Sequence, residues 1–262
     1  MAKTRLTIEL LKRAKMNGEM FNICAIIVAA KQSIKSDSPI LYNGTSYENS
    51  INFHFLSGHM ANGVNEWFEH ALKLGLSDVR LTANLTGSSD ERLLLSFSNS
   101  TKKSIICIFK EHMSCFVPYW KYNKNQRGWD IIYKEFGLEK DVNLENFSDN
   151  TEAFMAILTK IATFADEIEC ENFGECFRRA LKSLRSSSND NQKIFNAPLM
   201  PKKNLALFDA ASLADVFGGM GSWNDDAAGM AQYKKRGKEY DELSSELFTQ
   251  MRKALLFAIN EW

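Results

Sequence analysis

Long apolar runs and an excess of charge of either sign are both missing from this chain of 262 residues. Its 32 basic and 32 acidic residues cancel, so the chain lacks an overall field that would attract nucleic acid or an anionic membrane surface. No segment approaches the roughly 20 apolar residues that cross a bilayer, and the apolar run 23–30 is followed by no signal-peptide cleavage pattern. We therefore expect a cytoplasmic protein that does not bind membranes.

Complete catalytic and metal-binding signatures are missing as well. The chain has four histidines, and no paired Cys or His motifs with the spacing of a zinc site. It has no Gly-x-Ser-x-Gly elbow, phosphate-binding P-loop or dinucleotide-binding fingerprint. The five cysteines are an odd number in mainly apolar surroundings, which favours reduced, buried thiols over a disulfide framework. The sequence therefore favours a non-enzymatic protein with no catalytic residues, no metal site and no cofactor.

Helical periodicity alternates with short apolar runs, which predicts an α+β fold that is mainly helical. Helices are expected over residues 4–35 with an interruption at Gly18, and over 67–75, 150–184, 205–217 and 240–259. Short aromatic or branched runs between polar turns predict a small antiparallel sheet near residues 79–133. Its expected strands are 80–85, 92–97, 104–109 and 115–120, and Pro118 would lie at an edge or an end of the sheet.

The most polar window, residues 186–192, indicates a boundary in the chain. We expect an α+β domain over residues 1–185, a flexible linker or loop over 186–204, and a helical C-terminal segment over 205–262. The two structured parts are also compatible with a single domain. A second polar window, residues 36–50, predicts a loop.

The segment 217–226, called the glycine corner below, is the most unusual part of the sequence. It contains three glycines within four residues, followed by residues that favour turns and helix N-caps. We interpret it as a tight corner between two helices, and the alternatives are a cradle for a phosphate and a loop that contacts a partner. The candidate binding residues here are Gly218, Gly219, Gly221, Ser222, Trp223, Asn224 and Asp225.

The sequence Gly-Gly-Met-Gly-Ser-x-Asn-Asp in this corner resembles a motif in a family of uncharacterised bacterial proteins. That family is associated with the gene neighbourhoods of polymorphic toxins, where a role as immunity proteins has been supposed. The resemblance covers about residues 205–262 and carries over no catalytic residues. It implies a bacterial protein of a toxin–immunity or antiphage-defence system.

A second candidate surface lies in the segment 119–129, where aromatic and basic residues interleave. Such a surface suits single-stranded nucleic acid, which stacks its bases on aromatic rings, and it equally suits a protein partner. The zero net charge favours the protein partner. The candidate contact residues are Trp120, Tyr122, Arg127 and Trp129.

Charge is segregated locally. The segment 141–176 is strongly acidic, the segment 177–203 is basic, and a basic cluster occupies 234–238. An acidic patch of this kind can bind a basic toxin or nuclease, and the alternative is that both segments are solvated faces of helices.

Two functions from different classes follow. We expect a protein that binds another macromolecule, with a toxin or a defence-complex subunit as its protein partner and nucleic acid as a further possible partner. The alternative is a metal-dependent enzyme that acts on nucleic acid or a nucleotide, with carboxylates as metal ligands. Those carboxylates would be Asp209, Asp215, Asp225 and Asp226.

Overall fold

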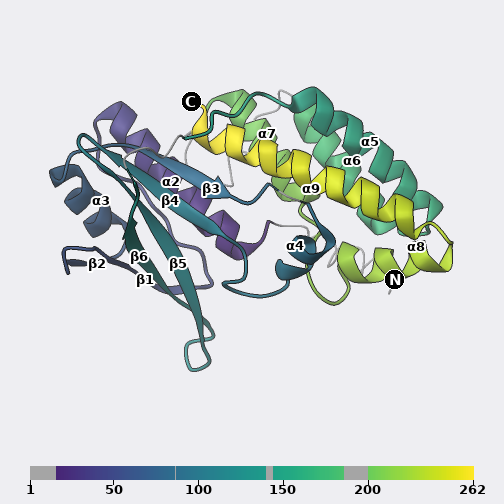
Figure 1. Cartoon of the computed structure of the whole chain (residues 1–262), viewed down its shortest axis with the longest axis horizontal. Helices are drawn as coiled ribbons and strands as arrows, with labels where there is room; N and C mark the ends of the chain where they lie inside the picture. Colours follow the sequence, from purple (N-terminus) through teal and green to yellow (C-terminus); the bar gives the residue numbers. More distant parts are fainter. Residues whose placement is uncertain (1–15, 86, 140–143, 186–199) are drawn as a thin grey trace.

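The computed structural model describes residues 16–85, 87–139, 144–185 and 200–262 and has an α+β fold, as predicted (Figure 1). The described residues form one six-stranded sheet in the order β2-β1-β6-β5-β4-β3. Its strands are β1 (Glu48–His54), β2 (Met60–Asn62), β3 (Leu76–Ala83), β4 (Lys103–Phe109), β5 (Met113–Asn123) and β6 (Gly128–Gly137). The helices are α2 (Gly18–Ser36), α3 (Val64–Lys73), α4 (Ser89–Leu94), α5 (Thr151–Glu167), α6 (Glu171–Arg185), α7 (Lys202–Ala214), the π-helical turn η2 (Trp223–Ala227), α8 (Ala228–Tyr233) and α9 (Gly237–Asn260).

The sheet is mixed, which corrects the prediction of an antiparallel sheet over residues 79–133. Strands β3 to β6 form an antiparallel meander, in which β3, β4 and β5 correspond to the predicted strands 80–85, 104–109 and 115–120, while β6 was not among the predicted strands. However, β1 pairs in parallel with β6, and β2 pairs with β1, so the sheet extends back to residue 48. Pro118 lies where β5 has passed the end of its pairing with β4 and pairs only with β6, so β5 is locally an edge strand there.

The predicted strand 92–97 is wrong, because this segment begins within helix α4. Ser88 caps the helix, and its hydroxyl accepts a hydrogen bond from the backbone N–H of Glu91 at 3.3 Å. A serine followed three residues later by a glutamate is a known signal for a helix start. The capping side chain stabilises the first turn, and of the leucines that suggested a strand, Leu93 and Leu94 lie on this short helix and Leu95 follows it directly.

One face of the sheet packs against α2 and α3, and several large aromatic side chains are buried there. Phe53 stacks on Trp67 and on Tyr133, with ring centroids 4.8 Å apart in both pairs. The Tyr133 hydroxyl donates a hydrogen bond to the side-chain carbonyl of Asn22 in α2 at 2.6 Å. This bond ties α2, which packs mainly on β3 and β4, to strand β6 as well.

A second layer of helices lies beyond strand β3 (Figure 1). Helix α9 contacts β3, α5 and α7, and α6 packs on α5 and α7. The predicted helices over 150–184 and at the C-terminal end are therefore confirmed as α5, α6 and α9. Buried side chains from the sheet and from these helices form one continuous hydrophobic cluster.

The predicted linker 186–204 falls mostly on residues 186–199, which lie outside the described residues. Residues 202–204 belong to α7, and the Asn204 side chain donates hydrogen bonds to backbone carbonyls at the end of α9, including that of Ala258 at 3.2 Å. The proposed division into 1–185 and 205–262 thus stays a prediction.

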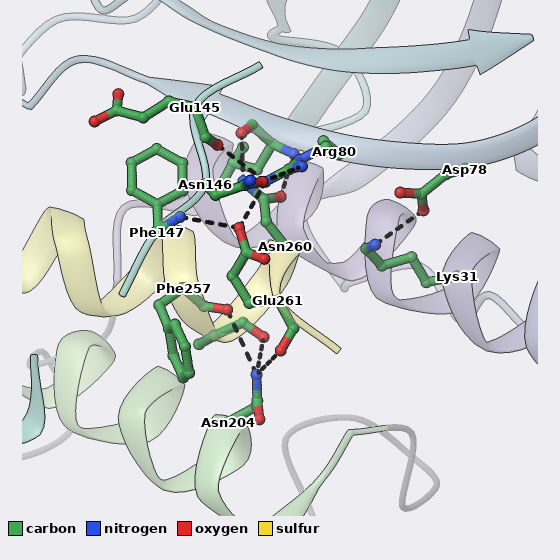
Figure 2. A network of polar contacts seen from close by, with 12 residues as sticks. Lys31, Asp78, Arg80, Glu145, Asn146, Phe147, Asn204, Phe257, Asn260 and Glu261 are labelled. Carbon is green, nitrogen blue, oxygen red and sulfur yellow. Dashed lines mark hydrogen bonds and ion pairs between the residues drawn. The ribbon is translucent and has the colours of Figure 1, made fainter. Parts of the chain in front are cut away.

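The end of α9 is attached to the edge strand β3 by a polar network (Figure 2). The Asn260 side chain accepts a hydrogen bond from the Leu81 N–H at 2.7 Å and donates one to the Leu81 carbonyl at 2.9 Å. Next to it, Arg80 forms an ion pair with Glu261 at 2.6 Å.

In the part of the chain that the structure describes, no helix is long and apolar enough to cross a membrane.

Candidate functional site

The glycine corner is anchored by Trp223, whose side chain is completely buried. Three phenylalanines and Tyr240 surround the indole, with ring centroids 5.2 to 6.4 Å from it; the phenylalanines are Phe164, Phe173 and Phe177. The indole N–H donates to the Ser244 hydroxyl at 2.8 Å, and the Tyr240 hydroxyl donates to the Trp223 carbonyl at 2.8 Å. Trp223 therefore joins the corner to α5, α6 and α9, and its side chain is not available on the surface.

The backbone at Gly221 requires glycine, because its φ of 74° lies in the left-handed region. The Gly221 N–H donates to the Asp225 carboxylate at 2.8 Å. Ser222 caps the π-helical turn, and its hydroxyl accepts from the Asn224 N–H at 3.2 Å. The turn is thus closed by its own side chains, as expected for a tight corner, while Met220 is 98% exposed.

The corner also holds the segment that follows α4. The Asn224 side chain donates to the Arg92 carbonyl at 2.8 Å and to the Gly218 carbonyl at 3.2 Å. A Cβ atom at Gly219 would come within 3.7 Å of the Ser96 side chain, so the two segments are in close contact. Because Asn224 bonds α4 and Gly219 contacts Ser96, the corner positions residues 92–98.

The segment 119–129 is the β5–β6 hairpin, which extends beyond the rest of the sheet (Figure 1). Tyr119 is 42% and Tyr122 is 48% exposed, and the Arg127 side chain is exposed at the tip. Trp120 is buried at the base of the hairpin, and Trp129 is half-buried between the two, 5.3 Å from Tyr122 and 5.8 Å from Trp120. Of the predicted contact residues, Tyr122 and Arg127 are thus exposed.

The hairpin tip is a well-defined turn. The Asn123 side-chain carbonyl accepts hydrogen bonds from the backbone N–H groups of Asn125 and Gln126 at 3.1 and 3.3 Å. Arg127, the last residue before β6, has a φ of 52° and therefore adopts the left-handed conformation. The tip therefore presents its side chains from a fixed backbone.

The hairpin base is braced by Asn99, a residue that the sequence did not single out. Its side chain accepts from the Trp120 N–H at 2.6 Å and donates to the Trp120 carbonyl at 2.8 Å. Asn99 thus takes the place of a neighbouring strand beyond the end of β4. The only signal for this in the sequence is that Asn99 lies in the polar turn before β4.

The acidic segment is partly neutralised by cations from other elements. Within the described residues, four of its carboxylates form such ion pairs, two of them with the C-terminal basic cluster: Asp149–Lys203, Asp166–Arg178, Glu167–Arg236 and Glu169–Lys234. In the same part of the structure, the hairpin cations Lys121, Lys124 and Arg127 form no ion pair.

The carboxylates of the alternative metal site are not brought together. Asp209 and Asp215 are buried in and just after α7, and burial raises the pKa of Asp215, with Arg252 opposing this rise. The Asp225 carboxylate is bonded to the Gly221 N–H at the surface, and Asp226 is exposed. Among the described residues, no group of three or more His, Cys, Asp or Glu side chains is placed to hold a metal ion.

The two candidate regions thus differ in burial: the glycine corner lies mainly in the core, and the hairpin lies at the surface.

Comparisons of this chain with models of protein families, with curated proteins and with solved structures found no match.

Proposed function

We propose that this chain is a non-enzymatic protein that binds an acidic protein partner through the exposed surface of the β5–β6 hairpin. This hairpin surface consists of Tyr119, Lys121, Tyr122, Lys124 and Arg127, with Tyr119 and Lys121 on one face of β5, Tyr122 on the other face, and Lys124 and Arg127 at the tip. The observation that carries the proposal is that exposed tyrosines and cations gather on one projecting hairpin, and that these cations form no ion pair within the described residues.

The composition of the hairpin surface supports a protein partner. Tyrosine and arginine are over-represented among the residues that dominate the energy of protein interfaces. Lys134 lies over the Tyr119 ring, 5.0 Å from its centroid, so the cation and the ring share one face of the hairpin. The Asp130 carboxylate, on the residue that pairs with Lys121 across the hairpin, accepts hydrogen bonds from Ser50 at 3.0 Å and Asn123 at 3.0 Å. An acidic partner would complement the remaining positive charge.

The fixed backbone of the hairpin supports binding without rearrangement. The tip is closed by Asn123, and the base is braced by Asn99 on the side that β4 does not reach. A surface that is ordered before binding avoids part of the entropy cost of association. A toxin or a subunit of a defence complex, in the bacterial setting that the glycine corner implies, is the partner class we propose.

The test is affinity capture from cells that produce the protein, followed by quantitative mass spectrometry of the bound proteins. The variant combines Tyr122→Ala with Arg127→Gly, because glycine keeps the left-handed backbone of residue 127 while the cation is removed. The matched control is Tyr233→Ala, which removes a tyrosine that is 80% exposed on α8.

We expect one protein in near-stoichiometric amount with the wild type and the Tyr233→Ala control, and at least tenfold less of it with the hairpin variant. Equal recovery by all three, with unchanged thermal unfolding, would contradict the proposal. The enzyme alternative would be favoured by a different result. In that case the wild type would have a divalent-metal-dependent nuclease or nucleotidase activity, and a folded double variant with Asp225→Ala and Asp226→Ala would lose it.

A further inference from the structure

A small cavity of about 120 Å³ lies where the helices on the sheet meet the second layer of helices. Helices α2, α4 and α9, the end of strand β3 and the segment 100–102 before β4 supply its lining residues. The volume is enough for several water molecules or for one small ion. The chemistry of the lining side chains decides between them.

Arg252 of α9 is the most unusual residue of this wall, because it is a buried cation. It is only 3% exposed, and its guanidinium lies over the ring of Phe248, another lining residue, 4.9 Å from the ring centroid. In the described part of the chain, Arg252 forms no hydrogen bond and no ion pair. A guanidinium carries five N–H donors, so burial without any acceptor is costly.

The nitrogens of Arg252 keep accessible surface, although the residue as a whole is buried. The Nε atom of Arg92, a second buried arginine, is completely shielded and has no partner, whereas no nitrogen of Arg252 is shielded in this way within the described residues. A nitrogen that has neither a partner nor a complete shield faces open space. Since Arg252 lines this cavity, its guanidinium can donate to a ligand there.

Two carboxylates act on Arg252 from a distance, and neither contacts it. Asp215 is buried, and burial raises the pKa of its carboxyl group while Arg252 opposes this rise. Its carboxylate accepts a hydrogen bond from the Asn17 N–H at 3.3 Å instead. Glu91 lines the cavity, and its carboxylate accepts a hydrogen bond from the Asn84 amide. The Arg252 guanidinium therefore has no direct counter-charge among the described residues.

The segment before β4 adds two further donors to the wall. The Lys102 side chain is exposed and carries a second positive charge. The Thr101 hydroxyl accepts a hydrogen bond from the Lys103 ammonium at 2.8 Å, so its own hydrogen is left to donate. The described lining residues thus carry two cations against the single carboxylate of Glu91. The planar fork of a guanidinium matches two oxygens of a phosphate or carboxylate.

We propose that this cavity binds a phosphate group, with the Arg252 guanidinium as its main donor. The phosphate would supply the missing counter-charge, and Lys102 and the Thr101 hydroxyl would bind its remaining oxygens. The group has two possible sources, the free inorganic ion and a small phosphomonoester. This inference does not rest on the proposed protein partner, because no residue of the hairpin surface lines the cavity.

The experiment measures the heat of binding of three probes to the purified full-length protein in a phosphate-free buffer. The probes are inorganic phosphate, glycerol 2-phosphate as a phosphomonoester, and chloride at the same ionic strength. Saturable binding of one phosphate per chain, with no saturable binding of chloride, is the expected result. Tighter binding of glycerol 2-phosphate than of inorganic phosphate would identify a phosphomonoester as the source, and equal or weaker binding would identify the free ion.

Two variants test the donors. Arg252→Lys keeps the charge and removes the two-pronged geometry, so phosphate binding should weaken at least tenfold. Lys102→Gln removes an exposed cation and should weaken binding about threefold to tenfold without affecting the fold. The matched control is Lys110→Gln, because Lys110 is also exposed but does not line the cavity, and it should leave the affinity unchanged.

A direct measurement covers the case in which Arg252→Lys does not fold. In NMR spectra of the wild type, the Nε–H resonance of Arg252 should shift saturably as phosphate is added. The proposal would be overturned if neither phosphate probe bound the wild type, or if this resonance did not shift. An equal loss of affinity in Lys102→Gln and Lys110→Gln would also overturn it, because binding would then follow the overall charge and not the cavity.

Discussion

The indole N–H of Trp223 donates to the Ser244 hydroxyl at 2.8 Å inside a completely buried ring of aromatic side chains. This bond joins the glycine corner to the N-terminal part of α9. The fold therefore depends on a residue that belongs to the most unusual segment of the sequence.

Trp223→Ala is expected to lower the free energy of unfolding by about 3–5 kcal/mol, because it leaves a large cavity in the core. Ser244→Ala is expected to cost about 1–3 kcal/mol, since the buried indole N–H would lose its acceptor. Urea denaturation followed by circular dichroism measures both. The control Met220→Ala, an exposed residue in the same corner, should change the value by less than about 0.5 kcal/mol. Similar losses for all three variants would show that the corner does not depend on Trp223.

Gly221→Ala is expected to destabilise the protein by about 1–2 kcal/mol, because an alanine at a φ of 74° is strained. Gly229→Ala is the matched control within α8. A Cβ atom there would meet nothing within 4 Å, and alanine has the higher helix propensity, so we expect a gain of up to about 1 kcal/mol. Thermal unfolding of the two variants in parallel measures the difference. Equal effects of the two substitutions would argue against a left-handed residue 221.

Glu19 and Lys103 form a buried ion pair that joins α2 to β4, and burial lowers the pKa of Lys103 while Glu19 opposes this shift. Glu19→Gln should destabilise the protein by about 3 kcal/mol, because the Lys103 ammonium would stay buried without its counter-charge. Adding Lys103→Met should recover most of that loss, since the charge is then removed as well. Denaturant titrations of the single and double variants give these values. A Glu19→Gln variant within about 1 kcal/mol of the wild type would contradict the prediction.

The stability of the protein is expected to fall as the pH drops below about 6.5. His70 stacks on His59 with ring centroids 3.8 Å apart, and its pKa is lowered by burial, by His59 and by Lys73, against an opposing effect of Glu135. The folded state thus disfavours the protonated ring, so stability is complete above the unfolded pKa and decreases below it. NMR titration of the His70 ring should give a midpoint below 6.5, and His59→Asn should raise it. A midpoint at or above 6.5 in the wild type would refute this assignment.

The long helices and the meander were predictable because their signals are local. In α9 the buried residues Tyr240, Leu247, Met251 and Leu255 recur at helical spacing, and strands β3 to β5 have short runs rich in branched and aromatic residues. Strand β1 has only Ile51 and Phe53 as apolar residues, and its parallel partner β6 is distant in the sequence. Parallel pairing of this kind leaves no hairpin signal, so the mixed sheet was missed.

The candidate site was only partly predictable, for a different reason. The aromatic and basic composition identified the hairpin, but composition does not separate the exposed Tyr122 from the buried Trp120. Likewise, the burial of Trp223 depends on rings supplied by α5, α6 and α9, which no local pattern can show. Helix α4 was missed although Ser88 and Glu91 have the spacing of a capping box, because the leucine run after them suggested a strand.

The side chain of Asn260 affects whether copies of this protein can associate through the edge of the sheet. Strand β3 is an edge of the sheet, and an open edge is a template on which another molecule can add a strand and start aggregation. At Leu81 both backbone groups are already occupied by the Asn260 amide, which acts as a short stretch of neighbouring strand. The last turn of α9 therefore protects this position from edge-to-edge association. It does so with the side chain of one asparagine and without an additional strand.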